Sequence, residues 1–159
     1  MRSFILAIFF LVSTSSSFAY IAEFPKSPEE VLTPGSLCSR PDQYRYPEKI
    51  PYCNRSVDRE LKQHIFEDYR KMGYHLPSSK RSDYKIDHFI PLCAGGSNRG
   101  DNLWPQHVSV FTHTDPLESI GCQKLKEGKL TQSELVQKII LVKHNLSKAP
   151  QVLQYLKSL

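Results

Sequence analysis

Residues 84–106 form the most informative stretch of the chain: Tyr84-Lys-Ile-Asp-His-Phe-Ile-Pro-Leu92, then Gly95-Gly-Ser-Asn98, then Asn102-Leu-Trp-Pro-Gln106. The first segment is rich in aromatic and β-branched residues, and glycine, asparagine and aspartate follow it over 95–101. This pattern is typical of a strand that ends in turns. It predicts a hairpin with a long connection over residues 84–104.

Helices are expected after this hairpin. Asp115-Pro-Leu-Glu118 places Asp at an N-cap, Pro at the first helical position and Glu at the third, and predicts a helix that runs to about Glu127. Thr131-Gln-Ser-Glu134 is a capping box that opens another helix. A short terminal helix is expected around 152–156. The apolar stripe of the capping-box helix is assigned to the core: Leu135, Val136, Ile139, Ile140 and Val142.

The chain before the hairpin divides into an irregular arm and a helix. Prolines and a glycine interrupt residues 20–52, at Pro25, Pro28, Pro34, Gly35, Pro41, Pro47 and Pro51. Apolar residues then recur at helical spacing from Val57 to Met72, with Ser56 as the expected N-cap and Gly73 as the end. We therefore expect an arm over 20–55 and a domain over 56–159, with its core at 84–127.

The first residues have the features of an export signal. Arg2 precedes the apolar run Phe4–Val12, and small residues at Ser17 and Ala19 have the spacing that a signal peptidase accepts. The run is too short to cross a membrane, which takes roughly 20 apolar residues. The sequence predicts a signal peptide over 1–19 and a mature chain without a membrane segment.

Length and charge limit the possibilities only loosely. The chain has 159 residues, enough for one domain, with 40% hydrophobic and 23% charged residues. These proportions exclude long disorder, collagen and coiled coil as the main architecture. The formal net charge is +5, and Arg2 contributes one of these charges. A mild positive surplus suits an anionic partner without requiring one.

The four cysteines point to an oxidising compartment. Cys38, Cys53, Cys93 and Cys122 allow three pairings, and the sequence alone does not choose among them. We favour Cys38–Cys53, which would close a Pro- and Tyr-rich loop, together with Cys93–Cys122. There is no Cys-x-x-Cys pair, so the sequence does not suggest a four-cysteine zinc site.

Titratable and metal-binding side chains gather around the hairpin and the residues after it: Asp87, His88, Asn98, Asn102, His107, His113 and Asp115. The ordered set of Asp-His, Pro-Leu, Gly-Gly-Ser-Asn and Asn-Leu-Trp-Pro-Gln resembles the HNH endonuclease family, and specifically its small exported bacterial branch. The resemblance covers most of the chain after residue 20 and is strongest over 86–106. It implies an α+β fold built on a ββα-metal core with additional helices.

The resemblance also implies roles for individual residues. His88 would be the general base, Asp87 a metal ligand, and Asn102 the central asparagine that braces the loop so that His88 points at the attacking water. Phosphodiester hydrolysis needs such a base and a cation for the charge that develops on the phosphoryl oxygens. The implied cofactor is one divalent metal ion, with Mg²⁺ as first choice and Zn²⁺, Mn²⁺ or Ni²⁺ as alternatives.

The last metal ligand is where this sequence departs from the family pattern. The family places a His or Asn about nine residues after the central asparagine, and Phe111 stands there. We select His113 as the ligand. Asp115, His107 and Glu118 are the alternatives.

A geometric condition accompanies these roles. Adjacent side chains on a regular strand point to opposite faces, so Asp87 and His88 reach one metal only if the strand bends or ends there. Pro91 nearby agrees with such a bend. A regular strand over 86–89 would count against the mechanism.

The resulting expectation is an exported, metal-dependent endonuclease that acts on DNA or RNA with little sequence specificity, in the periplasm or secreted. Arg99 is the selected substrate contact, since basic residues that flank the site can bind phosphates. Alternatives are an inactive module that binds nucleic acid, metal or protein, and a hydrolase of another phosphate ester. A monomer is the default, and the sequence does not say whether an inhibitor protein binds the chain.

Overall fold

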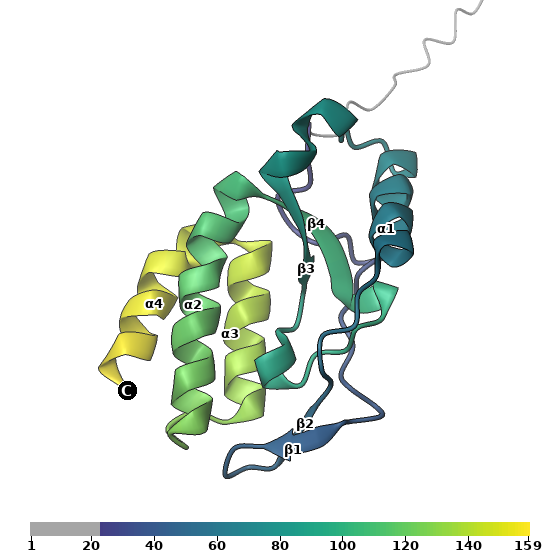
Figure 1. Cartoon of the computed structure of the whole chain (residues 1–159). Helices are drawn as coiled ribbons and strands as arrows, with labels where there is room; N and C mark the ends of the chain where they lie inside the picture. The colour runs from purple at the N-terminus through teal and green to yellow at the C-terminus, as the bar shows by residue number, and fades with distance from the viewer. Residues whose placement is uncertain (1–22) are drawn as a thin grey trace, which may run out of the picture.

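The computed structural model describes residues 23–159, and the predicted signal peptide over 1–19 lies outside them. Within the described residues the chain forms four α-helices and two antiparallel two-stranded sheets (Figure 1). The expectation of a mixed α+β fold is confirmed. In the same part of the chain, no helix combines the length and apolar character that crossing a membrane requires.

The predicted hairpin is present. Strand β3 (Tyr84–His88) pairs antiparallel with β4 (Leu103–His107), with Tyr84 opposite His107 and His88 opposite Leu103. Their connection contains two short 3₁₀ turns, Leu92–Ala94 and Gly100–Asn102. Helix α2 (Val108–Lys126) follows β4 without a break, so two strands and a helix succeed one another along the chain.

Helix α2 begins eight residues earlier than the sequence predicts, since it starts at Val108 rather than at Pro116. The His107 side chain accepts a hydrogen bond from the Ser109 amide at 3.2 Å and serves as the N-cap. Pro116 lies inside the helix on its exposed side, where the carbonyl it leaves without a helical donor can be hydrated. Burial of Val110 and Leu117 on one face holds the helix together across the proline.

The other helices agree more closely with the sequence patterns. Helix α1 (Arg59–Lys71) forms, although Asp58 rather than Ser56 caps it, by accepting from the Leu61 amide at 2.8 Å. Helix α3 (Gln132–His144) opens with the predicted capping box, in which Thr131 and Glu134 bond reciprocally. The terminal helix α4 (Ala149–Ser158) is longer than predicted.

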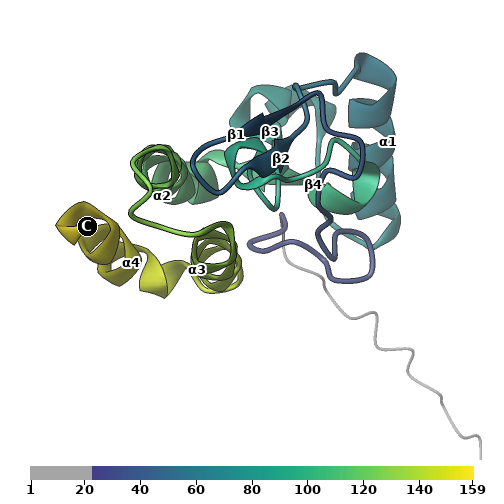
Figure 2. The ribbon, with the colours of Figure 1, turned by 90° about the horizontal axis from the view of Figure 1, so that it is seen from below.

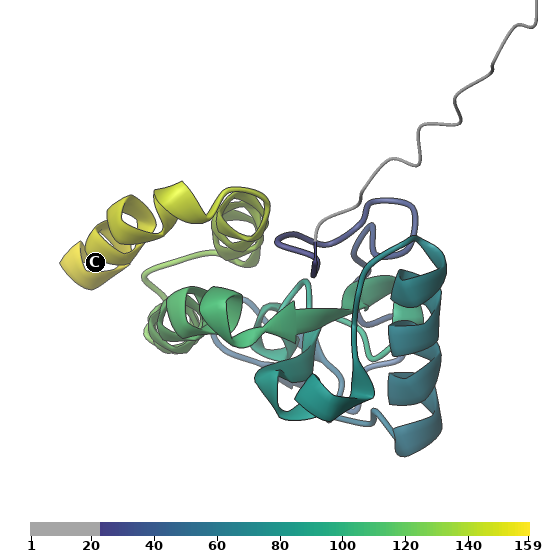
Figure 3. The ribbon, with the colours of Figure 1, turned by 90° about the horizontal axis from the view of Figure 1, so that it is seen from above.

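Helices cover the β3–β4 hairpin from opposite sides. Helix α1 lies on one side, and α2, α3 and α4 form a group on the other, as the views from below and above show (Figures 2 and 3). Each side has its own apolar core. The α1 side includes Phe66, Tyr69, Tyr84 and Ile86, and the side of the helical group includes Leu117, Leu135, Ile139 and Leu156.

The N-terminal arm contains a small hairpin that the sequence did not predict, β1 (Gln43–Arg45) with β2 (Ile50–Tyr52). Both favoured disulfides are confirmed, Cys38–Cys53 within the arm and Cys93–Cys122 between the β3–β4 connection and α2. The Cys38 amide also donates to the Gly95 carbonyl at 2.8 Å. The arm is therefore bonded directly to the connection that follows His88.

Candidate functional site

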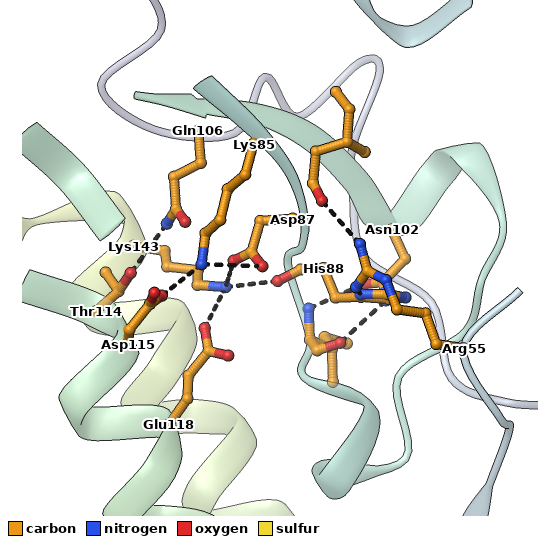
Figure 4. A network of polar contacts seen from close by, with 12 residues as sticks. Arg55, Lys85, Asp87, His88, Asn102, Gln106, Thr114, Asp115, Glu118 and Lys143 are labelled. Carbon is orange, nitrogen blue, oxygen red and sulfur yellow. Dashed lines mark hydrogen bonds and ion pairs between the residues drawn. The ribbon is translucent and has the colours of Figure 1, made fainter. Parts of the chain in front are cut away.

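The side chains of Asp87 and His88 point to opposite faces of β3 and contact different neighbours (Figure 4). Strand pairing is regular through His88 opposite Leu103, and the Phe89 amide still donates to the Asn102 carbonyl at 2.7 Å. The expected bend that would bring both side chains to one metal ion is therefore not found, and this regular strand counts against the metal-dependent mechanism that the resemblance implies. The site consists of two adjacent halves, one on each face of the strand.

Asn102 fixes the backbone just after His88. Its Oδ1 accepts from the Ile90 amide at 2.9 Å, and its Nδ2 donates to the carbonyls of Ile90 at 3.0 Å and Ser97 at 2.9 Å. The side chain is fully buried. Gly96 is required nearby, because a Cβ there would lie 1.8 Å from the Ile90 carbonyl oxygen. The connection is thus clamped at both ends, as a brace for His88 would need.

Hydrogen bonds at both ring nitrogens orient His88. Nδ1 lies 3.1 Å from an Arg55 guanidinium nitrogen, and Nε2 lies 3.1 Å from Asn98 Oδ1. A guanidinium only donates, so Nδ1 is the acceptor, and Nε2 carries the proton that it donates to Asn98. The Asn98 amide is itself fixed, because its Nδ2 donates to the Asn54 carbonyl at 2.7 Å. The arrangement therefore sets the tautomer with a lone pair on Nδ1.

The surroundings of His88 favour the neutral imidazole. Burial lowers its pKa to about 4, and although the Asn98 hydrogen bond opposes this shift, the positive charge of Arg55 adds to it. At neutral pH the ring is therefore uncharged and retains its Nδ1 lone pair. This is the protonation state that a general base requires.

The other half of the site is a buried charge cluster around Lys143, on α3 (Figure 4). Its Nζ lies 3.1 Å from Asp87 Oδ2 and 2.6 Å from Glu118 Oε1, and it donates to the His88 carbonyl. Lys85 Nζ lies 3.4 Å from Asp87 Oδ1. Both carboxylate oxygens of Asp87 therefore face an ammonium group.

The pKa values in this cluster follow from burial and mutual charge. Burial alone would raise the pKa of Asp87, but Lys143 and Lys85 outweigh it and lower that pKa. Burial would lower the pKa of Lys143, and Asp87 and Glu118 reverse the direction and raise it. Burial raises the pKa of Glu118 to about 7, against the opposing effect of Lys143. Asp87 and Lys143 thus form an ionised pair.

The predicted metal ligands are not assembled. His113 is exposed on α2 and forms no hydrogen bond or ion pair with Asp87 in the part of the chain that the structure describes. Across residues 23–159, no group of three or more His, Cys, Asp or Glu side chains is arranged to hold a metal ion. Because lysines pair with both oxygens of Asp87, the residues around it do not fit a divalent cation.

The alternative ligands are also engaged elsewhere. Asp115 pairs with Lys85 at 2.5 Å, Glu118 contacts Lys143, and His107 caps α2 while its ring stacks on Phe24 at 4.0 Å. Arg99, the selected substrate contact, is exposed on the β3–β4 connection and pairs with Asp101 at 3.1 Å. Among the described residues it forms no hydrogen bond with His88.

Two residues of the site were missed by the sequence reasoning. Lys143 follows Ile139 by four residues, so it lies on the buried face of α3, and a lone lysine in an apolar stripe was the available signal. Arg55 lies in the arm, 33 residues before His88, and no local pattern marks it.

In comparisons with known proteins, no family model, no curated protein and no solved structure matches the chain.

Proposed function

We propose that the chain is an exported endonuclease that hydrolyses phosphodiester bonds with little sequence specificity, with His88 as the general base. The observation that carries the proposal is the neutral His88, whose Nδ1 lone pair faces the guanidinium of Arg55. A base and a phosphate-binding cation thus lie side by side. The resemblance to HNH endonucleases over residues 86–106 supports the same reaction.

The proposed step needs a phosphate that binds Arg55, which is exposed. When the bound phosphate draws the Arg55 guanidinium off Nδ1, the lone pair is freed. A water beside Nδ1 then gives a proton to His88 and attacks phosphorus. The bond from phosphorus to the leaving oxygen breaks, and that oxygen takes up a proton from solvent water. Asn98 keeps the ring oriented by accepting from Nε2. Arg55 stabilises the charge that develops on the phosphoryl oxygens.

No step is assigned to a divalent metal ion, since the residues around Asp87 do not fit one. The metal dependence that the resemblance implies is tested by chelation. If EDTA abolished activity, the required cation would be bound by groups other than Asp87, whose oxygens pair with Lys85 and Lys143. If activity persisted in EDTA, Arg55 and neighbouring cationic side chains would be the groups that stabilise the charge on the phosphate.

Export is part of the proposal. The signal-like segment over 1–19 and two disulfides both favour an oxidising compartment, the periplasm or the exterior. A nucleic acid encountered there is the proposed substrate, which agrees with the net positive charge.

The test uses the purified chain with both disulfides formed. Supercoiled plasmid, a single-stranded RNA and a small aryl phosphodiester are incubated with it, in MgCl₂ and in EDTA. Nicking of plasmid or cleavage of RNA supports the proposal. No hydrolysis of any substrate under either condition would reject it.

A second candidate is a binding module that has this frame and lacks turnover. Specific observations favour it: His88 is only 3% exposed, and the predicted metal ligands are apart. Binding of nucleic acid without cleavage, with Mg²⁺, Mn²⁺, Zn²⁺ and Ni²⁺ each tried, would support this candidate over the enzyme.

A further inference from the structure

A basic cavity lies on the α1 side of the molecule, away from the Lys143 cluster. Its volume is about 490 Å³, within the range of small-molecule sites, and α1 and the 3₁₀ segment Ser78–Asp83 line it. Four cationic side chains and one acidic side chain contribute to its walls: Arg59, Lys62, Arg70 and Arg81, with Glu67. The cavity is therefore strongly positive.

These cations are not neutralised by the protein. None of the four forms an ion pair with a carboxylate among residues 23–159, whereas the neighbouring Lys71 and Lys80 pair with Asp68 and Glu23. The difference matters because an unpaired cation keeps its charge available to a ligand.

Two of the guanidiniums are held in place. Arg70 Nε donates to the Leu76 carbonyl and an Arg81 guanidinium nitrogen to the Tyr84 carbonyl, both at 2.8 Å. Both groups also lie against the Phe66 ring, 5.7 Å and 4.2 Å from its centroid. Burial and the nearby charge of Arg70 lower the pKa of Arg81. Two like charges held close together, neither of them in an ion pair among the described residues, are typical of an anion site.

The cavity and His88 lie on the same side of β3. Side chains two residues apart share a face of a strand, so Tyr84, Ile86 and His88 point the same way, and Tyr84 packs edge-on against Phe66 at 6.0 Å. Tyr84 and His88 are about 13 Å apart along the strand, at roughly 3.3 Å per residue.

The face of α1 that lines the cavity is basic. Arg59, Lys62, Phe66 and Arg70 recur at three and four residues and so share one face of the helix. Arg55 lies in the arm, four residues before Arg59 and outside the helix. From Arg59 to Arg70 the helix rises about 16 Å, at 1.5 Å per residue. In a B-form duplex each strand presents a phosphate about every 3.4 Å of helix axis, so roughly five phosphates of a duplex strand fit that length.

We propose that this cavity binds the phosphate backbone of a nucleic-acid strand and places a neighbouring phosphodiester at Arg55 and His88. The inference rests on the proposed function for the cleaved bond, while binding itself does not depend on cleavage. The proposed substrate is a polyanionic strand that spans α1, rather than a mononucleotide.

The test measures binding of a fluorescent 20-nucleotide single-stranded DNA by anisotropy, in EDTA, over a range of salt concentrations. The cavity variant is Arg70→Gln with Arg81→Gln. The matched control is Lys71→Gln with Lys80→Gln, which removes the same charge one position away on α1 and the 3₁₀ segment, outside the cavity. A second cavity variant, Arg59→Gln with Lys62→Gln, removes no side-chain hydrogen bond of the described protein and so guards against misfolding.

Each cavity variant should weaken binding on the order of tenfold and reduce the slope of log affinity against log salt by about 1.4, for two lost phosphate contacts. The control should stay within about twofold of wild type. Equal weakening by the control, or unchanged binding by both cavity variants, would overturn the proposal.

Cleavage separates this inference from the proposed function. If no substrate is cleaved but the cavity variants still lose affinity, the binding site stands and the hydrolytic function fails. If plasmid is cleaved but the cavity variants bind normally, the function stands and the site fails.

Discussion

Nζ of Lys143 lies 3.1 Å from Oδ2 of Asp87, and both residues are buried between β3 and the helices packed on it. The same ammonium donates to the backbone carbonyl of His88. The strand that carries the proposed base is thus tied to α3 by a charge pair on its opposite face. Lys143 positions β3 without contacting the proposed substrate.

Replacing Lys143 by Met should therefore be strongly destabilising. The variant leaves Asp87 and Glu118 buried without their shared cation, and breaking a buried ion pair on one side costs about 3–5 kcal/mol. Urea unfolding measures the loss, with Lys148→Met, at an exposed lysine, as the control. A loss below about 1 kcal/mol would show that the cluster does not stabilise the fold.

Asn102→Asp tests the clamp after His88 with almost no change in size. The new oxygen would face the carbonyls of Ile90 and Ser97, which now accept from Nδ2. We expect a loss of about 2–4 kcal/mol in the free energy of unfolding, since two buried acceptors lose their donor. Asn145→Asp is the matched control, because Asn145 uses only its Oδ1, as acceptor for Ser147. Similar losses in the two variants would refute the clamp.

His88 should make the fold sensitive to acid. Its folded pKa of about 4 lies below the ordinary value of 6.5, so its contribution is fully present above pH 6.5 and is lost as the pH falls through 4. The shift corresponds to about 3 kcal/mol. The free energy of unfolding should fall less between pH 7 and pH 4 in His88→Gln than in wild type, with His64→Gln, exposed on α1, as the control. Parallel pH profiles of wild type and His88→Gln would contradict the assignment.

The Cys93–Cys122 disulfide ties the β3–β4 connection to α2 across a separation of 29 residues. Replacing both cysteines by Ala should cost about 3–4 kcal/mol on the chain-entropy model. The cleavage rates of the variant and wild type, compared at a temperature where the variant is folded, show whether the Cys93–Cys122 disulfide also affects the site around His88. An unchanged unfolding midpoint would mean that the bond constrains neither state.

Local signals in the sequence predicted local structure well. Thr131 and Glu134 fix a helix start through their own side chains, so the capping box alone was sufficient for α3. The same kind of signal failed at Asp115, because burial of Val110 and Leu117 extends α2 back to β4 across the proline. Tertiary packing decided that boundary, and no local pattern reports it.

The site shows the same limit. The pair Asp87-His88 was found from the motif, but a regular strand separates the two side chains, and their partners come from distant segments. Lys143 is 56 residues from Asp87, and Arg55 is 33 residues from His88. Such contacts depend on how α1 and α3 pack on the hairpin, which the sequence pattern does not specify.

The most direct test of the central claim is the rate at which His88→Ala nicks supercoiled plasmid, compared with wild type and His64→Ala. The measurement uses folded proteins with both disulfides formed. The account predicts a loss of at least about 100-fold for His88→Ala, the usual contribution of a general base, and no more than a twofold change for His64→Ala. A His88→Ala protein that nicks plasmid within a few-fold of the wild-type rate would contradict it.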